Sequence, residues 1–145
     1  MKLLYAEDEP TMAEAVVDIL TYHNHLVDAV SDGEDALSYA LSETYDGIIL
    51  DPPSYGRGTN GEMWKLEDSI CDLMNMCTEV LSDNPLFIVL NSYTTGLSSS
   101  VMTYLLQMTV GRKYKIRVDS QEIGLPVEQT GLAVPAGNTA VVYFD

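Results

Sequence analysis

Acidic residues follow two of the apolar segments that the sequence predicts as buried strands. Glu7 and Asp8 come directly after residues 3–6, and Asp51 comes directly after residues 47–50. In an open parallel sheet the carboxyl ends of neighbouring strands meet in one crevice, so we expect these three carboxylates to share a pocket. Such crowding is costly unless protons or a cation neutralise it, and a hard ion such as Mg²⁺ fits oxygen ligands. The sequence therefore allows a weak Mg²⁺ site here, with plain solvated acids as the alternative.

A second pattern begins at the same aspartate. It reads Asp51-Pro52-Pro53-Ser54-Tyr55. Proline has no N–H, so neither residue after Asp51 can donate a backbone hydrogen bond to a group held there. The two prolines alone would be explained by a rigid turn. They open a loop that is rich in Gly and Pro and extends to about residue 61.

Strand and helix patterns alternate along most of the chain. Strands are predicted at 3–6, 26–30, 47–50, 86–90, 113–118 and 139–144, and helices from Pro10, Ser31, Leu66 and Ser98. Residues 124–137 are predicted as a turn-rich excursion. The alternation up to about residue 118 predicts an α/β fold, a three-layer αβα sandwich around a doubly wound, mainly parallel sheet of about six strands. The last two strands have no helix between them and should pair antiparallel.

Length and composition favour one globular domain over residues 1–145. The chain is 46% hydrophobic, and its formal net charge is −15. Residues 1–51 hold twelve acidic residues against one basic residue, Lys2. Such a surface disfavours nucleic acid, and we interpret the basic run at 112–117 as a solvated strand end. No apolar run reaches membrane-span length and no signal peptide is seen, so we expect a cytoplasmic, soluble recombinant protein with no membrane partner.

The residues up to Asp51 resemble the first half of a response-regulator receiver domain. The resemblance rests on residues 1–10 and 45–51. It implies that Asp51 is a phosphoacceptor and that Glu7 and Asp8 hold the metal. Ser92 or Thr94 could supply the family's hydroxyl at the end of the fourth strand, but no Lys-Pro pair occurs anywhere. The resemblance implies that the family uses the lysine of this pair to stabilise the phosphoryl group. Without it, and without backbone N–H groups at residues 52 and 53, an acyl phosphate on Asp51 lacks stabilisation, so we expect the phosphoacceptor to be vestigial.

The residues from Asp51 onward resemble the second half of a class I S-adenosylmethionine-dependent methyltransferase, in the branch that includes ribosomal RNA cytosine methylases. The motifs are Asp51 to Tyr55, Gly56-Arg57-Gly58, Gly61 to Leu66, Leu90 to Leu97, Gly124 to Glu128 and Pro135-Ala136-Gly137. The resemblance implies that residues 51–55 help to place the acceptor base.

The cofactor side of that family is missing from the sequence. Methyltransferases use a glycine-rich loop after the first strand, because only glycine lets the backbone approach the cofactor closely. This chain has Ala6-Glu7-Asp8-Glu9-Pro10 there, and no glycine occurs before Gly33. The acids would also repel the cofactor's carboxylate. We therefore expect no cofactor-binding residues, and we interpret Asp51 to Tyr55 as a vestigial methyltransferase motif.

The leading hypothesis is an engineered chimera of the two families, joined within residues 45–51. Under this hypothesis we expect a protein with no evolved biochemical function or partner, no catalytic residue and no required cofactor, which is not an enzyme. The alternatives are a receiver-like phosphorelay domain with Mg²⁺ and phosphoacceptor Asp51, and a methyltransferase. The methyltransferase resemblance implies strand order 2-1-3-4-6-5, with the last strand antiparallel. A free sheet edge allows either a monomer or a weak homodimer.

Overall fold

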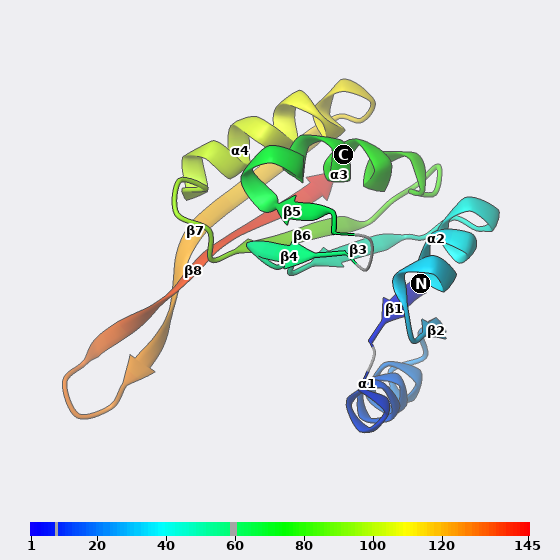
Figure 1. The fold of residues 1–145 in the computed structure, drawn as a ribbon, viewed down its shortest axis with the longest axis horizontal. Helices are drawn as coiled ribbons and strands as arrows, with labels where there is room; N and C mark the ends of the chain where they lie inside the picture. Colours follow the sequence, from blue (N-terminus) through cyan, green and yellow to red (C-terminus); the bar gives the residue numbers. More distant parts are fainter. Residues whose placement is uncertain (8, 59–60) are drawn as a thin grey trace. The chain divides into compact units, whose positions relative to one another are not determined.

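A computed structural model describes residues 1–7, 9–58 and 61–145, with 33 and 34 described by their backbone alone (Figure 1). The chain contacts divide it into two compact units. Unit 1 comprises Met1–Ile48 and Glu79–Phe87, and unit 2 comprises Ile49–Thr78 and Ile88–Asp145. A single domain over 1–145 is what the sequence predicts. The division falls inside the strand in which the predicted join lies.

Unit 1 begins with a parallel strand pair and the two helices that follow its strands. Strand β1 (Lys2–Ala6) pairs with β2 (Leu26–Val30), and helix α1 (Pro10–Tyr22) connects them. Helix α2 (Gly33–Ser42) follows β2. The Asp32 side chain caps α2 by accepting a hydrogen bond from the Asp35 N–H at 2.8 Å. The helix start predicted at Ser31 is therefore shifted by one residue.

The segment Glu79–Phe87 belongs to unit 1 because its backbone bonds to the residues just before β3 (Gly47–Leu50). The Tyr45 N–H donates to the Val80 carbonyl at 3.0 Å, and the Ser82 N–H donates back to the Tyr45 carbonyl at 3.0 Å. The Leu86 N–H donates to the Asp46 carbonyl at 2.7 Å. Unit 1 thus combines residues from both sides of the predicted join.

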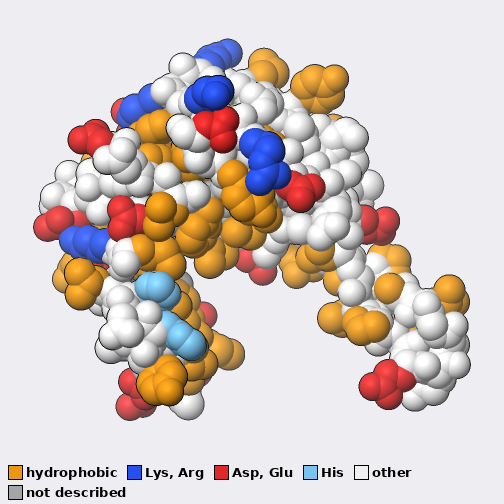
Figure 2. Space-filling model, turned by 180° about the vertical axis from the view of Figure 1, so that it is seen from behind, with side chains coloured by type: hydrophobic (Ala, Val, Ile, Leu, Met, Phe, Trp, Pro, Cys, Tyr) orange, Lys and Arg blue, Asp and Glu red, His pale blue; other side chains and the backbone are white. Residues whose placement is uncertain are grey.

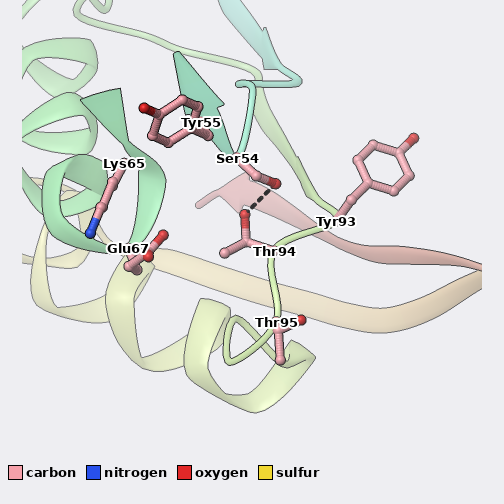
Figure 3. A pocket seen from close by; sticks show the side chains of 7 residues that line it. All are labelled: Ser54, Tyr55, Lys65, Glu67, Tyr93, Thr94 and Thr95. Carbon is pink, nitrogen blue, oxygen red and sulfur yellow. Dashed lines mark hydrogen bonds between the residues drawn. The ribbon is translucent and has the colours of Figure 1, made fainter. Parts of the chain in front are cut away.

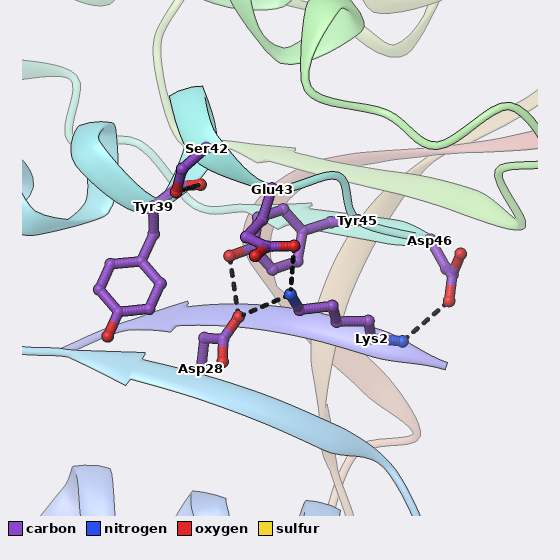
Figure 4. A network of polar contacts seen from close by, with 7 residues as sticks. All are labelled: Lys2, Asp28, Tyr39, Ser42, Glu43, Tyr45 and Asp46. Atoms are coloured by element: carbon purple, nitrogen blue, oxygen red, sulfur yellow. Dashed lines mark hydrogen bonds and ion pairs between the residues drawn. The ribbon is translucent and has the colours of Figure 1, made fainter.

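A polar network surrounds Tyr45, whose side chain is 1% exposed (Figure 4). Its hydroxyl donates to the Asp28 carboxylate at 3.0 Å, and the Lys2 ammonium pairs with Asp28 at 3.3 Å and with Glu43 at 2.9 Å. The Lys2 N–H donates to the Asp46 carboxylate at 2.8 Å, and the Ser82 hydroxyl donates to the same carboxylate at 3.1 Å. These contacts fix the start of β1 beside residues 45–46.

Unit 2 contains most of a four-stranded sheet of order β3-β6-β8-β7. Its further strands are β6 (Phe87–Ser92), β7 (Ile116–Val127) and β8 (Leu132–Phe144). Alternate residues of β6 are buried. Helix α3 (Leu66–Glu79) buries residues spaced four apart, Leu66, Ile70, Met74 and Thr78. Helix α4 (Ser99–Met108) is capped by Ser98, packs on β7 and β8, and is followed by the 3₁₀ turn η1 (Val110–Arg112).

The α/β class is confirmed, and so is the position of the last strand. Strand β8 lies between β6 and β7 and runs antiparallel to β7. The predicted pairing of the first strand with the third is not among the sheet pairings of the described residues. There, β1 pairs with β2 alone, and the Asp46 N–H donates to the Lys2 carbonyl at 3.2 Å. The Lys2 N–H donates to the Asp46 side chain, so it is not free to continue a ladder of backbone hydrogen bonds between β1 and the start of β3.

Two segments predicted as loop or turns are strands in the structure. The loop after Asp51 contains a short antiparallel hairpin, β4 (Tyr55–Arg57) with β5 (Met63–Lys65). The excursion at 124–137 is instead the outer part of the β7–β8 hairpin, which turns at 128–131. Two residues of β8, Ala136 and Gly137, lie opposite Ile123 and form a β-bulge. The bulge accommodates the prolines and glycines of this segment, which the sequence predicts as turns.

Gly137 gives the first testable prediction. Its φ is +101°, and an added Cβ would lie 2.6 Å from the Ser92 carbonyl oxygen. We expect Gly137→Ala to lower the free energy of unfolding by about 1–3 kcal/mol, because both backbone strain and a backbone clash result. Gly131→Ala is the matched control, since its φ is also positive (+68°) but nothing lies within 4 Å of its added Cβ. Urea unfolding followed by circular dichroism measures both; equal losses would contradict the predicted clash.

Tyr45 gives the second prediction. Burial and the hydrogen bond to Asp28 raise the pKa of its hydroxyl to about 12. Since this pKa exceeds that of an unfolded tyrosine, the stabilisation is complete below about pH 10 and is lost as the pH rises towards 12. We expect Tyr45→Phe to cost about 1 kcal/mol at pH 7 and to remove this alkaline decline. Tyr39→Phe, whose side chain is 42% exposed, serves as the control and should change stability by less than about 0.5 kcal/mol. An unchanged alkaline profile in Tyr45→Phe would contradict the assignment.

Candidate functional site

The residues of the predicted carboxylate pocket are not brought together in one described unit. Glu7 follows β1 in unit 1, Asp51 is exposed in unit 2, and Asp8 lies outside the described residues. The Glu7 carboxylate accepts hydrogen bonds from the Glu9 N–H at 3.1 Å and from the Tyr5 hydroxyl at 3.5 Å. Within the described part of the chain, no group of three or more His, Cys, Asp or Glu side chains is placed to hold a metal ion. The Mg²⁺ site stays a prediction.

The turn between β1 and α1 is closed by its own acidic side chains. The Glu9 carboxylate caps α1 by accepting from the Thr11 N–H at 3.1 Å and the Met12 N–H at 2.6 Å. These bonds, the one to Met12 foremost, hold the pKa of Glu9 below its usual range. Pro10, at the first position of the helix, has no N–H to offer. The free amides of this helix end are therefore already occupied by a negative charge.

The residues after Asp51 form one side of an open pocket of about 350 Å³ in unit 2 (Figure 3). Its lining is Ser54, Tyr55, Lys65, Glu67, Tyr93, Thr94 and Thr95. The Thr94 hydroxyl donates to the Ser54 hydroxyl at 2.7 Å. This bond ties the motif that follows β3 to the segment that follows β6, because Ser54 and Thr94 come directly from those two regions of the chain.

Two tyrosine rings lie on either side of the Ser54–Thr94 pair (Figure 3). Tyr55 is 50% exposed and Tyr93 is 59% exposed. The Arg57 guanidinium donates to the Tyr55 hydroxyl at 3.1 Å, and that hydroxyl contacts the Met63 sulfur at 3.4 Å. Half-exposed aromatic faces next to hydroxyl groups suit a planar ligand that both stacks and forms hydrogen bonds.

Backbone contacts position this lining. Hairpin pairing places Tyr55 opposite Lys65, and the Leu66 N–H donates to the Ser54 carbonyl at 3.1 Å. The Trp64 indole N–H donates to the Pro53 carbonyl at 2.8 Å, which holds the Pro-Pro turn against β5. The Pro-Pro turn, predicted as a rigid turn or as a motif that places the acceptor base, positions pocket residues in the structure.

The far side of the pocket is held by β6 and β8. The buried Ser92 hydroxyl accepts from the Thr94 N–H at 3.1 Å. A tight turn with Gly96 at φ +94° follows, in which the Leu97 N–H donates to the Thr94 carbonyl. The Asn138 amide donates to the Leu97 carbonyl at 3.3 Å, so β8 supports this turn.

Most of the residues that line the pocket lie in motifs recognised in the sequence, but their grouping in one pocket was not predicted. Ser54 and Tyr55 belong to the predicted motif, but Asp51 and the two prolines do not line the pocket. Thr94 belongs to the methyltransferase stretch at residues 90–97 and is also a candidate for the receiver hydroxyl. The signal for Lys65 was the glycine-rich loop between two short β-prone segments, which can be interpreted as a hairpin that brings residue 65 opposite residue 55.

Comparisons with known proteins find response regulators over about a third of the chain. Over 51 residues it is 43% identical to the transcriptional regulatory protein DltR of Streptococcus agalactiae, and over 50 residues 46% identical to the response regulator ArlR of Staphylococcus aureus. These stretches cover 35% and 34% of this chain, and 23% of each regulator. No family model matches the chain.

Solved structures give a second likeness, which extends over the whole chain. A SAM-dependent methyltransferase from Agrobacterium tumefaciens matches 97% of it with a TM-score of 0.66 and 20% identity. SMU.776, described as a methyltransferase and complexed with SAH, matches 100% of it with a TM-score of 0.65 and 20% identity. The chain spans 48% and 39% of the lengths of these two proteins. At this identity the likeness establishes a Rossmann-like α/β sandwich fold.

Together the comparisons confirm the two-part resemblance, because response regulators match about a third of the chain and methyltransferases match its fold. They also correct one expectation. The sequence predicts that the chain is not an enzyme, whereas its fold is that of an enzyme class along nearly its full length.

The described residues after β1 do not fit the cofactor of that class. S-adenosylmethionine carries a carboxylate, and here the helix amides that could bind one, those of Thr11 and Met12, donate to the Glu9 carboxylate instead. A ligand carboxylate would also meet the negative charge of Glu7. No helix of the described residues is long and apolar enough to span a membrane.

Glu9 gives the prediction from this site. Because its pKa is lowered in the folded protein, its stabilisation is complete above the unfolded pKa near 4.5 and is lost as the pH falls through the folded value. We expect NMR titration to place the pKa of Glu9 below 4.5 and to show the Thr11 and Met12 amides shifting with it. In Glu9→Gln those amide shifts should vanish, while Glu14→Gln on the same helix should leave them intact. Amide shifts that persist in Glu9→Gln would contradict the cap.

The chemistry of the pocket in unit 2 rests on Ser54, Thr94 and the two tyrosines. The pocket offers hydroxyl donors and acceptors, one cationic side chain at Lys65 and one anionic side chain at Glu67. Together these groups can hold a neutral polar ring in a single orientation.

Proposed function

We propose that unit 2 binds a planar methyl-acceptor group, as the acceptor side of a domain of the S-adenosylmethionine-dependent methyltransferase type. The observation that carries the proposal is the 2.7 Å hydrogen bond between Ser54 and Thr94, flanked by Tyr55 and Tyr93. It joins two of the segments that carry the methyltransferase resemblance, at the carboxyl ends of neighbouring strands β3 and β6. That edge is where open α/β sheets bind ligands.

The size and polarity of the pocket define the class of ligand. A volume of about 350 Å³ suits one small ring system. The hydroxyl groups of Ser54 and Thr94 and the charges of Lys65 and Glu67 suit a ring with both donors and acceptors, such as a nucleobase or an aromatic amide. Because the chain carries a net charge of −15, we propose a free base or nucleoside rather than a nucleic acid strand.

We further propose that the two parts have different ancestry and were joined by engineering within residues 45–51. High identity to response regulators is confined to about 50 residues, while the motifs from Asp51 onward belong to the methyltransferase resemblance. Recombination in a strand that both folds share preserves the alternation of strands and helices. A natural family whose members cover both 1–45 and 52–145 would contradict this proposal.

The receiver interpretation is the second candidate, and identity of 43–46% to response regulators favours it. Asp51 is exposed at the end of β3 and accessible to a phosphodonor, but two prolines follow it. Addition of Mg²⁺ and beryllofluoride tests this candidate. Chemical-shift changes confined to Glu7 and to residues around Asp51 would support it, and an unchanged spectrum would exclude it.

The acceptor proposal predicts weak, specific binding of a nucleobase. Titration with cytosine, followed by NMR, should shift the signals of Ser54, Tyr55, Tyr93 and Thr94 together. We expect Tyr93→Ala to weaken binding about fivefold or more, because one stacking face is lost. Tyr104→Ala on α4 is the matched control, since Tyr104 is 73% exposed and does not line the pocket.

Two outcomes would count against the proposal. Equal weakening by Tyr93→Ala and Tyr104→Ala would mean that cytosine stacks on any exposed tyrosine, and shifts outside the pocket lining would place the site elsewhere. Titration with S-adenosylmethionine by calorimetry is a separate arm. A dissociation constant below about 1 mM would show that the turn after β1 accepts the cofactor despite Glu9.

A further inference from the structure

Strand β7 is an edge of the four-stranded sheet, and its outer side has no strand partner among the described residues. Along its first half, side chains alternate between half-buried Ile116, Val118 and Ser120 and exposed Arg117 and Asp119. An open edge of this length can pair with another strand through its backbone. The charges on its exposed face decide which partner and which register are acceptable.

The outer part of the hairpin shows that β7 leads into a surface that is not covered within the chain. Leu125, Leu132 and Val134 are 66%, 70% and 54% exposed. Figure 2 shows apolar side chains along this arm, with an acidic side chain near its end. Two-stranded hairpins are marginally stable alone in water, so a partner strand that extends the sheet at the base of this arm would support it.

A second copy of the chain fits the edge if two β7 strands run antiparallel about a twofold axis. Twofold symmetry keeps the same faces together, so the axis must pass through a residue that faces itself. An axis at Arg117 or at Asp119 places like charges directly opposite each other, which is unfavourable. An axis at Val118 instead places Arg117 of each copy opposite Asp119 of the other.

The same register matches the remaining charges near the edge. With the axis at Val118, residue 122 of one copy lies opposite residue 114 of the other. Glu122 thereby approaches the stretch that holds Arg112 and Lys113, and four of the seven basic residues of the chain lie within 112–117. In a chain of net charge −15, these bases and the acids of β7 are therefore complementary to a second copy.

Arg117 is already held in position for such a pair. Its guanidinium stacks over the Tyr143 ring at 4.2 Å from the ring centroid, on the exposed face of the β7–β8 pair. Pro126, which cannot donate to a ladder, lies beyond the residues that would pair. The bulge after Glu122 and the twofold symmetry limit the pairing segment to about residues 114–122, which is short and gives modest affinity.

We propose that the chain forms a twofold homodimer in which the β7 strands of two copies pair antiparallel about Val118. Two Arg117–Asp119 ion pairs, one on each side of the axis, fix the register. The proposal is independent of ligand binding in the pocket, because neither Arg117 nor Asp119 lines it.

A charge-swap experiment tests this dimer. Sedimentation equilibrium of the full chain should show a monomer–dimer equilibrium that weakens at high salt. We expect Arg117→Asp and Asp119→Arg each to raise the dissociation constant about tenfold, because each replaces both ion pairs by like charges. The double variant R117D/D119R should restore dimerisation, and an equimolar mixture of the two single variants should form heterodimers, since every cross-strand pair is then complementary.

Asp72→Arg provides the matched control. It makes the same charge change as Asp119→Arg on an exposed residue of α3, and it should leave the dissociation constant unchanged apart from the effect of net charge. Circular dichroism checks that each variant is folded. A chain that is monomeric at all concentrations would overturn the proposal, and so would single variants that dimerise as well as the original chain or a double variant that does not recover.

Discussion

The backbone hydrogen bonds that Tyr45 and Asp46 exchange with residues 80–86 are the interaction on which the rest of the structure depends. They place a segment from the second half of the sequence against the end of the first third, in one compact unit. The Asp46 carboxylate adds bonds to the Lys2 N–H and to Ser82. Whatever the origin of the two parts, strand β3 can only continue into the sheet because its start is fixed in this way.

Local patterns were sufficient to predict most of the helices and the buried strands. Helix α3 buries Leu66, Ile70 and Met74 at the spacing of one helical face, and Ser98 caps α4 as its position suggests. The long β7–β8 hairpin was not predictable in this way. Pro126 and Pro135 signal turns when taken alone, and only the pairing of distant residues shows that an edge position and a bulge accommodate them.

The candidate site was predictable where one motif carries it and not where distant segments meet. Ser54 and Tyr55 follow from the Pro-Pro motif, but their neighbours Tyr93 and Thr94 lie about forty residues away and are placed by the order of β3 and β6. The carboxylate pocket was predicted from residues that belong to different units, Glu7 and Asp51, and from Asp8, which lies outside the described residues. No local sequence pattern determines whether such residues meet. Sequence periodicity fixes which residues lie at strand ends, whereas the partners of those residues depend on how the strands are arranged.

Asp51 satisfies two motifs at once, and the residues around it decide between them. A receiver needs amides and a lysine near the phosphoacceptor, whereas Pro52 and Pro53 remove two of those amides. The Trp64 indole N–H donates to the Pro53 carbonyl, and Ser54, which follows directly, accepts a hydrogen bond from the Thr94 hydroxyl in the pocket. The feature that impairs phosphoryl chemistry at Asp51 is therefore the one that builds the acceptor pocket beside it. This is the physical reason to assign the chemistry of unit 2 to ligand placement by Ser54 and its neighbours rather than to the aspartate.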